Sequence, residues 1–255
     1  MIVRRLSISS EALRDGQARP AFTAFLDAQR NVQPPYSVLL QATHSELAGN
    51  LVAALLPDAF GEIRPEVIES ARRHDFGWNP SDERQLERAG NRGPKPFPDL
   101  THEEQVSSWR ESLNLAQNPP LVNVLISRHF CCLAGNDPHF VSFRDRETSR
   151  RASLEETLPF SAAELDRWEA ALGFCDLLSL YLCSGAKESV SFPFAHPADP
   201  KAATAPKAIL SWKNGELEFD PPVLRERSEF AASGKMYQDG HISRENTNYR
   251  WTFIH

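Results

Sequence analysis

Cysteine is scarce in this sequence, which has four in 255 residues and no Cys-x-x-Cys pair. A disulfide-rich scaffold has a higher density of cysteines, and a thiolate zinc site typically shows cysteine pairs separated by about two to four residues, the spacing that is missing here. The chain also opens without the basic segment and apolar stretch of a secretory signal. These absences predict a cytoplasmic protein whose cysteines are reduced and buried.

Long apolar runs and an excess of positive charge are missing as well. No run approaches the roughly 20 apolar residues that a membrane-spanning helix needs, so a membrane partner is not expected. The formal net charge is -6, without the basic footprint of a nucleic-acid-binding protein, so no nucleic acid partner is expected either. A small anionic substrate is still allowed, because a metal ion and one or two arginines can reverse the local field.

Familiar catalytic signatures are also absent. The sequence has no glycine-rich phosphate-binding loop, no dinucleotide fingerprint and no Ser-His-Asp or Cys-His pattern that suggests a nucleophile. What is present is an ordinary globular composition, with 41% hydrophobic and 24% charged residues. The chain can therefore bury a core, and its length suits a single domain over residues 1–255.

Helical periodicity dominates the middle of the chain and predicts a mainly α fold. In residues 37–56 the stripe recurs at steps of three and four: Leu40, His44, Leu47, Leu51 and Leu55. Further helices are expected over residues 65–76 and 120–134, and after capping boxes that begin at Thr101 and Ser161. We expect these helices to form a bundle over about residues 36–185, with an irregular or weakly helical segment at 136–160.

Strand signals gather at the two ends of the chain. Residues 1–8 resemble a short strand, and Asn214-Gly215 between two alternating segments is a strong hairpin signal. Residues 249–254 alternate and predict a closing strand, which could pair with the N-terminal one. The expected β structure is therefore a small antiparallel appendage built from about residues 1–8 and 206–255.

Several predicted helices carry an ionisable residue on the face that should be buried. These residues are His44, the pair His74-Asp75, His129 and Asp176. A buried carboxylate without a partner is costly. Imidazoles and carboxylates together are a recognised ligand set for Mn, Fe, Co, Ni or Zn. The pattern predicts one divalent transition metal ion held by His44, His74, Asp75 and Asp176.

Each of these residues also has a simpler explanation. A single histidine on an apolar face is often a hydrogen-bonded core residue, and Asp176 could pair with Arg128 or Arg167. The role of His129 stays open between a fifth ligand, a substrate contact and a core histidine.

The order of the residues resembles the HD superfamily of metal-dependent phosphohydrolases. The positions that match are His44, His74, Asp75 and Asp176. The strings MIVRR, QATHSELAG, RRHDFGW and SRHF also look like a bacterial family known only as a domain of unknown function, over most of residues 1–185. The resemblance implies an HD-like helical bundle and a metal cofactor. Two-metal members add two histidines, and because only His129 lies on a clear stripe, a mononuclear site is expected.

A metal-dependent hydrolase would need further groups around the ion. Asp75 could both bind the metal and orient a water molecule that the metal activates. Asp82 or Glu83, in the proline-rich residues 79–100 predicted as a long loop, could act as general base. Their alternative is a solvated loop.

Positive charge and an aromatic surface are the remaining requirements of such a substrate site. Arg128 and Lys95 could bind an anionic substrate and Trp78 could stack on a ring. The alternatives are surface cations and a core tryptophan.

Three functions remain open from the sequence. The first is hydrolysis of a phosphoester or nucleotide-like small molecule. The second is an iron-dependent oxygenase on the same scaffold, which would need two metals and His102 or His139 as a further ligand besides His129. The third is a non-catalytic metal-binding or interaction protein.

Overall fold

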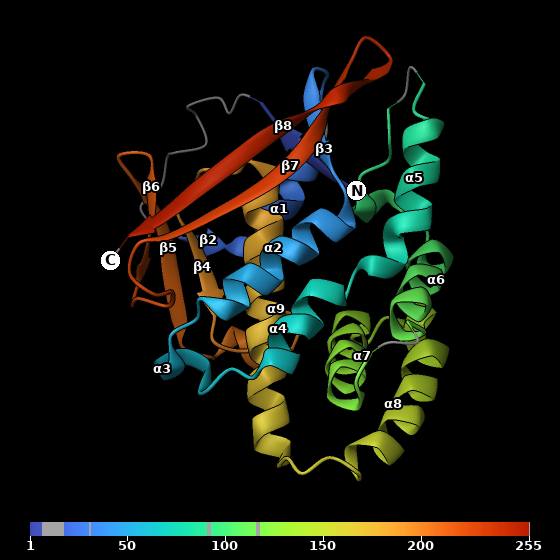
Figure 1. Cartoon of the computed structure of the whole chain (residues 1–255), viewed down its shortest axis with the longest axis vertical. Coiled ribbons are helices and arrows are strands. Elements are labelled where there is room, and N and C mark those ends of the chain that lie inside the picture. Colours follow the sequence, from blue (N-terminus) through green and yellow to red (C-terminus); the bar gives the residue numbers. More distant parts are fainter. Residues whose placement is uncertain (7–17, 31, 91–92, 116–117, 255) are drawn as a thin grey trace.

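A computed structural model describes residues 1–6, 18–30, 32–90, 93–115 and 118–254. Helices make up 51% of the structure and strands 22%, the latter in a single eight-stranded mixed sheet. Figure 1 shows the sheet on one side of the long gold helix α9 and helices α5 to α8 on the other. The prediction of a mainly α bundle with a small antiparallel β element is therefore wrong, and the fold is α/β.

The sheet draws strands from the whole length of the chain. Its order is β1-β3-β7-β8-β6-β5-β4-β2, with parallel pairs β6–β8 and β2–β4 and antiparallel pairs elsewhere. The strands are β1 (Ile2–Arg5), β2 (Arg19–Pro20), β3 (Tyr36–Leu39), β4 (Val190–Pro193), β5 (Lys207–Lys213), β6 (Glu216–Asp220), β7 (Ser228–Gln238) and β8 (His241–Ile254). The closing strand β8 lies between β7 and β6, and β1 pairs with β3, so the expected pairing of the two terminal strands is wrong.

Two tight hairpins set the register of the C-terminal strands. Asn214 and Gly215 join β5 to β6, each with a positive φ, as the sequence predicted. Asp239 and Gly240 join the longer strands β7 and β8 in the same way. Two-residue turns of this kind need positive φ at both positions, which explains the Asn-Gly and Asp-Gly pairs.

Nine named α-helices and several short 3-10 turns make up the other layer of the described structure. The helices are α1 (Ala21–Gln29), α2 (Gln41–Ala53), α3 (Pro57–Phe60), α4 (Pro65–Arg73), α5 (Asn79–Glu87), α6 (His102–Leu113), α7 (Pro120–Ala134), α8 (Val141–Glu155) and α9 (Ala162–Ser184). The predicted capping boxes are present at the starts of α6 and α9. The 3-10 turn η2 (Phe76–Trp78) follows α4 and belongs to the site described below.

Helix α9 joins the helical layer to the sheet. One side packs against α2, α4 and α7, and the other contacts β1 and β4. Its second half is buried on every side, and Phe174 stacks among Phe192, Phe194 and Phe219. Because both layers share this helix, the residues it carries are held rigidly between them.

Three local predictions differ from the structure. Residues 36–39 form strand β3 rather than the start of a helix, because a short, fully buried apolar run fits either structure. Residues 79–87 form α5 instead of a loop, since a proline is tolerated in the first helical turn. Residues 141–155 form the regular helix α8 instead of an irregular or weakly helical segment. Its mostly polar sequence buries only Phe143 and Glu147 and so carries no apolar stripe.

Two further findings concern membrane-spanning helices and the state of the cysteines. In the described residues, no helix combines the length and apolar character that crossing a bilayer requires. All four cysteine thiols are free, two of them buried and two half-buried.

Candidate metal centre

Ionisable residues from three of the apolar stripes meet at one buried point. His44 comes from the first turn of α2, His74 and Asp75 from the end of α4, and Asp176 from the middle of α9. None of these side chains is more than 10% exposed. The helix periodicity that placed each residue on an inward face is the reason they converge.

His74 directs a lone pair at a carboxylate. Its Nδ1 lies 2.8 Å from the carbonyl oxygen of Ala71, which can only accept, so this nitrogen carries a proton. The other nitrogen, Nε2, lies 3.1 Å from Asp176 Oδ1. In neutral His74 this nitrogen has no hydrogen, and two acceptors then face each other.

His44 repeats the arrangement on the opposite side. Ser179 donates its hydroxyl hydrogen to the carbonyl oxygen of Asp176 over 2.7 Å, so its oxygen accepts from His44 Nδ1 at 2.9 Å. The Nε2 atom of His44 lies 2.7 Å from Asp75 Oδ2. Two histidines therefore present Nε2 atoms to two carboxylates, each with the outer nitrogen fixed by an oxygen, as metal-ligating histidines commonly are.

A cation placed between the two Nε2 atoms and the two carboxylates would remove the repulsion between lone pairs that face each other. Burial opposes a charge on His74, but Asp75 and Asp176 outweigh it and raise its pKa to about 9, so a proton can fill the gap. Burial likewise opposes the charge of Asp75, yet His74 and His44 hold the pKa of Asp75 below its ordinary value. A divalent ion would serve the same purpose, since two carboxylates and two neutral imidazoles balance its charge.

The donor atoms fit one metal ion. Two overlapping sets have ligand atoms within 4.8 Å of one another: His44, His74 and Asp75, and His74, His129 and Asp176. His74 belongs to both sets, and since Ala71 occupies its Nδ1, only Nε2 is free. One nitrogen lone pair binds one ion, so the sets surround a single position. The buried His and Asp cluster can thus hold a metal ion, and its donors suit a transition metal.

The turn after the His-Asp pair fixes Asp75. The indole N–H of Trp78 donates to Asp75 Oδ1 over 2.9 Å and leaves Oδ2 facing His44. Between them, Gly77 lies so close to α6 that an added Cβ would be 2.1 Å from the carbonyl oxygen of Ser108. A glycine is required here because two backbone segments touch.

His129 adds a third imidazole to this buried cluster, which forms the floor of the pocket described below. It is fully buried, and its Nε2 lies 3.7 Å from Asp176 Oδ2, beyond hydrogen-bond distance. Among the described residues this Nε2 has no hydrogen-bond partner. Burial lowers the pKa of His129 well below its ordinary value, and the neighbouring histidines act in the same direction, so the ring is neutral.

A histidine that the sequence did not single out lies behind His129. The Nε2 atom of His196 is 2.8 Å from His129 Nδ1. Burial lowers the pKa of His196 to about 4, so this ring is neutral as well. His196 lies between Pro193 and Pro197 in a segment without periodic pattern, and no sequence signal marks it as buried.

An apolar pocket of about 310 Å³ opens onto the His and Asp cluster. Its walls are largely aromatic: Phe22, Trp78, Phe97, Trp109 and Phe140. Among the residues that the structure describes, no lysine or arginine lines it. Such a pocket, apolar with a few convergent polar groups, is typical of a small-molecule site.

Other residues predicted for the site lie elsewhere. Asp82 is fully buried and binds the amino group of Met1 at 3.2 Å and the backbone N–H of Gln41 at 2.7 Å. Glu83 and Lys95 are exposed and do not line the pocket. His102 and His139 stack on each other at the surface, with ring centroids 4.3 Å apart.

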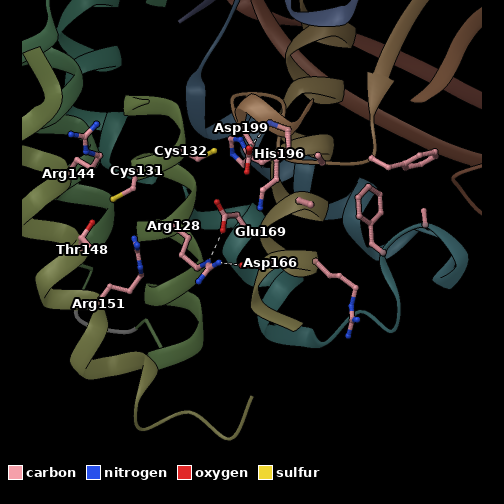
Figure 2. Close-up of a pocket in the computed structure, with 17 residues that line it drawn as sticks. Arg128, Cys131, Cys132, Arg144, Thr148, Arg151, Asp166, Glu169, His196 and Asp199 are labelled. Atoms are coloured by element: carbon pink, nitrogen blue, oxygen red, sulfur yellow. Dashed lines mark hydrogen bonds and ion pairs between the residues drawn. The ribbon is translucent and has the colours of Figure 1, made fainter. Parts of the chain in front are cut away.

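Arg128 lines a second, more polar cavity of about 540 Å³, shown in Figure 2. Its guanidinium points at the carboxylates of Asp166 and Glu169, and it also pairs with Glu155 at 3.1 Å. The arginine is thus already bound by acidic partners from α8 and α9. His196 lines both cavities and forms part of the wall between them.

Comparison with known proteins gives a family but no activity. A family model described as "Protein of unknown function (DUF3891)" matches residues 17–234. No curated protein and no solved structure matches the chain.

Proposed function

Since the chain belongs to the DUF3891 family, whose description assigns no activity, we propose a function from the site itself. The site binds one divalent transition metal ion through His44, His74, Asp75 and Asp176. With that ion it hydrolyses a small phosphoester, with an aromatic, nucleotide-like body held in the 310 Å³ pocket.

The observation that carries this proposal is the pairing of Nε2 atoms with carboxylates. His44 faces Asp75 at 2.7 Å and His74 faces Asp176 at 3.1 Å, with both Nδ1 atoms committed to oxygen acceptors. In a core held by hydrogen bonds alone, a single proton would satisfy one imidazole–carboxylate pair. Two such pairs around one point favour a metal ion instead. The order His, His-Asp, Asp agrees with the resemblance to HD phosphohydrolases.

The pocket suggests the kind of substrate. Its aromatic walls suit a flat or apolar body, because such surfaces lose water on contact. No lysine or arginine is among its described lining residues, so an anionic group would depend on the metal ion for compensation. A phosphate group placed on the floor and a ring between the aromatic side chains satisfy both conditions.

The chain's own residues would bind, orient and exclude water. A divalent ion held there supplies Lewis-acid chemistry, which polarises a substrate oxygen and acidifies water. Asp75, held by the Trp78 indole, and Asp176, rigid within α9, keep their oxygens in fixed directions. The aromatic walls keep bulk water from the floor, which strengthens every electrostatic contact there.

Metal analysis with a matched set of variants tests the proposal. Purified protein is reconstituted with Mn, Fe, Co, Ni or Zn in turn, and metal per chain is measured for wild type, His74→Ala, Asp176→Ala and His102→Ala. We expect one ion per chain in wild type and in His102→Ala, whose histidine is exposed, and loss of the ion in the other two. Circular dichroism must first show that each variant is folded.

Activity is then measured on the loaded protein. p-Nitrophenyl phosphate and a panel of nucleoside monophosphates are assayed with wild type and His74→Ala. Hydrolysis that disappears in the variant supports the proposal. No metal uptake with any of the ions contradicts it, and uptake without hydrolysis supports a non-catalytic metal-binding protein instead.

One observation favours a second candidate, an oxygen-using iron enzyme. The pocket is apolar and its described lining has no cation, which suits an uncharged substrate, and two histidines with one carboxylate are a known ligand set for non-haem iron. A two-metal version is disfavoured, since His74 has one free nitrogen and the exposed His102 and His139 lie outside the pocket. Oxygen consumption by the Fe(II)-loaded protein would distinguish this enzyme from a hydrolase.

A further inference from the structure

A backbone amide fixes the tautomer of His196. The N–H of Ala198 donates to His196 Nδ1 over 3.2 Å. A backbone amide can only donate, so this ring nitrogen carries the lone pair. Because His196 is neutral, its single ring proton must be on Nε2.

That proton determines the tautomer of His129. The Nε2–H of His196 points at His129 Nδ1, 2.8 Å away, so His129 Nδ1 is an acceptor. An imidazole that accepts at Nδ1 must carry its proton on the other nitrogen, so His129 has its proton on Nε2. This N–H is buried, has no partner among the described residues, and lines the pocket beside Asp176.

The three histidines at the pocket floor therefore differ in which ring nitrogen carries the proton. His44 and His74 have protons on Nδ1, bound by oxygen atoms, so that with a metal ion in place their Nε2 lone pairs point inward. His129 has the opposite tautomer and turns an N–H inward. A metal ion binds a lone pair and is not attracted to an N–H, whereas a substrate oxygen accepts from one.

We propose that His129 is not a metal ligand but a hydrogen-bond donor to an oxygen of the bound substrate, and that His196 is the positioning residue that imposes this state. The assignment of a substrate oxygen rests on the proposed function. A donor that is fixed before the substrate arrives stabilises negative charge developing on that oxygen. The substrate therefore carries an acceptor, such as a phosphoryl oxygen, next to the atom that the metal contacts.

Gly173 on α9 makes room for the positioning residue. A Cβ added there would be 2.4 Å from Cδ2 of His196 and 2.8 Å from its Nε2. The imidazole ring is rigid, so it would have to shift as a whole. Gly173→Ala should thus break the contact between His196 and His129 without altering either histidine.

Nitrogen NMR on the protein labelled with 15N-histidine reads the tautomer directly. The His129 signals are identified by their loss in His129→Gln. In the metal-free and the zinc-loaded protein, we expect an unprotonated Nδ1 and a protonated Nε2 for His129. For His44 and His74 we expect a protonated Nδ1 and a metal-bound Nε2 in the zinc-loaded protein. A His129 Nδ1–H, or a zinc-bound His129 Nε2, would overturn the proposal.

Variants separate positioning from general packing. In His196→Ala and Gly173→Ala we expect His129 to become a mixture of tautomers, while His196→Gln, whose amide can still donate, retains the Nε2–H form. Gly90→Ala, where nothing lies within 4 Å of the added Cβ, is the control and should leave the spectrum unchanged. An unchanged His129 tautomer in both His196→Ala and Gly173→Ala would contradict the role of His196.

Zinc affinity gives an independent result. His129→Ala should lower zinc affinity by no more than about 10–100-fold, the range of an indirect effect, whereas His74→Ala abolishes binding. Equal loss in both variants would make His129 a ligand and overturn the inference. None of these measurements requires turnover. If zinc binds but nothing is hydrolysed, the proposed hydrolase is wrong, and the NMR result still decides the role of His129.

Discussion

The backbone N–H of Gly77 donates a hydrogen bond to Ser112 Oγ over 2.9 Å. The contact joins the turn η2 to helix α6, where a Cβ added at Gly77 would be 2.1 Å from the carbonyl oxygen of Ser108. Asp75 and Trp78, on either side of Gly77 in this turn, are bonded to each other, so the position of a candidate ligand depends on how closely η2 approaches α6.

Gly77→Ala should disturb this arrangement. The added Cβ would be 2.3 Å from the backbone nitrogen of Ser112, so η2 must move away from α6. We expect a loss of about 1–3 kcal/mol in the free energy of unfolding, typical of overpacking, together with weaker zinc binding. Urea unfolding and zinc titration measure the two effects. Gly90→Ala serves as control, and equal behaviour of the two variants would contradict the prediction.

Trp78→Phe should weaken metal binding while keeping an aromatic wall. The substitution removes the indole N–H, which among the described residues is the hydrogen-bond donor to Asp75 Oδ1, and frees that carboxylate to rotate. Loss of such an outer partner commonly lowers metal affinity about 10–100-fold. Trp109→Phe is the matched control, because Trp109 lines the same pocket without contacting Asp75 through its N–H. Zinc competition with a chelator compares them; equal affinities would argue against the role of Trp78.

Metal binding should release a proton. The pKa of His74 is raised to about 9, so the metal-free ring is charged at neutral pH, and an ion must displace its proton. Apparent zinc affinity should therefore rise by about tenfold per pH unit until the pH reaches that pKa, and then level off. Calorimetry in buffers of different ionisation enthalpy counts the protons. An affinity independent of pH would mean that no proton occupies the position.

Asp82 and Glu83 should behave very differently although they are neighbours. Asp82 accepts the N–H of Gln41 at the start of α2, a helix without a capping side chain of its own, and also binds the Met1 amino group. Asp82→Ala should cost about 3–5 kcal/mol of stability, as for a broken buried ion pair. Glu83 is exposed, so Glu83→Ala should change the free energy of unfolding by no more than about 0.5 kcal/mol.

The same pair of variants addresses the general-base hypothesis. If either residue were the base, its alanine variant would keep metal but lose hydrolysis. We expect neither to do so, because Asp82 is committed to Gln41 and Met1 and Glu83 lies outside the pocket. Loss of hydrolysis in folded, metal-loaded Glu83→Ala would show that helix α5 moves over the site.

The sequence predicted elements whose signals are local. Capping boxes at Thr101 and Ser161 and the Asn214-Gly215 turn each act within a few residues, and all three are present. The candidate site could also be predicted from the sequence, because helical spacing alone places His44 and Asp176 on inward faces. Periodicity determines which face is buried, and convergence follows once the helices pack.

The sheet and the positioning histidine depend on distant partners. β3 is a short run buried on both faces, and its neighbours β1 and β7 come from opposite ends of the chain. The pair Asp239-Gly240 is by contrast a local hairpin signal, because an Asp-Gly pair readily adopts the positive φ that this turn needs at both positions. His196 carries no local signal, since its burial depends on the space above Gly173 and its partner His129 is 67 residues away.

The position of helix α9 between the two layers also limits which fragments of this protein can fold. A fragment ending at Gly185 would retain every proposed metal ligand, yet it would uncover the side of α9 on which Phe174 and Tyr181 meet Phe192. It would also lack His196. Such a fragment should aggregate through exposed aromatic surface, and any that stayed monomeric would hold its metal in a site without a fixed third histidine. The strands are accordingly as much a part of the centre as the helices that carry its ligands.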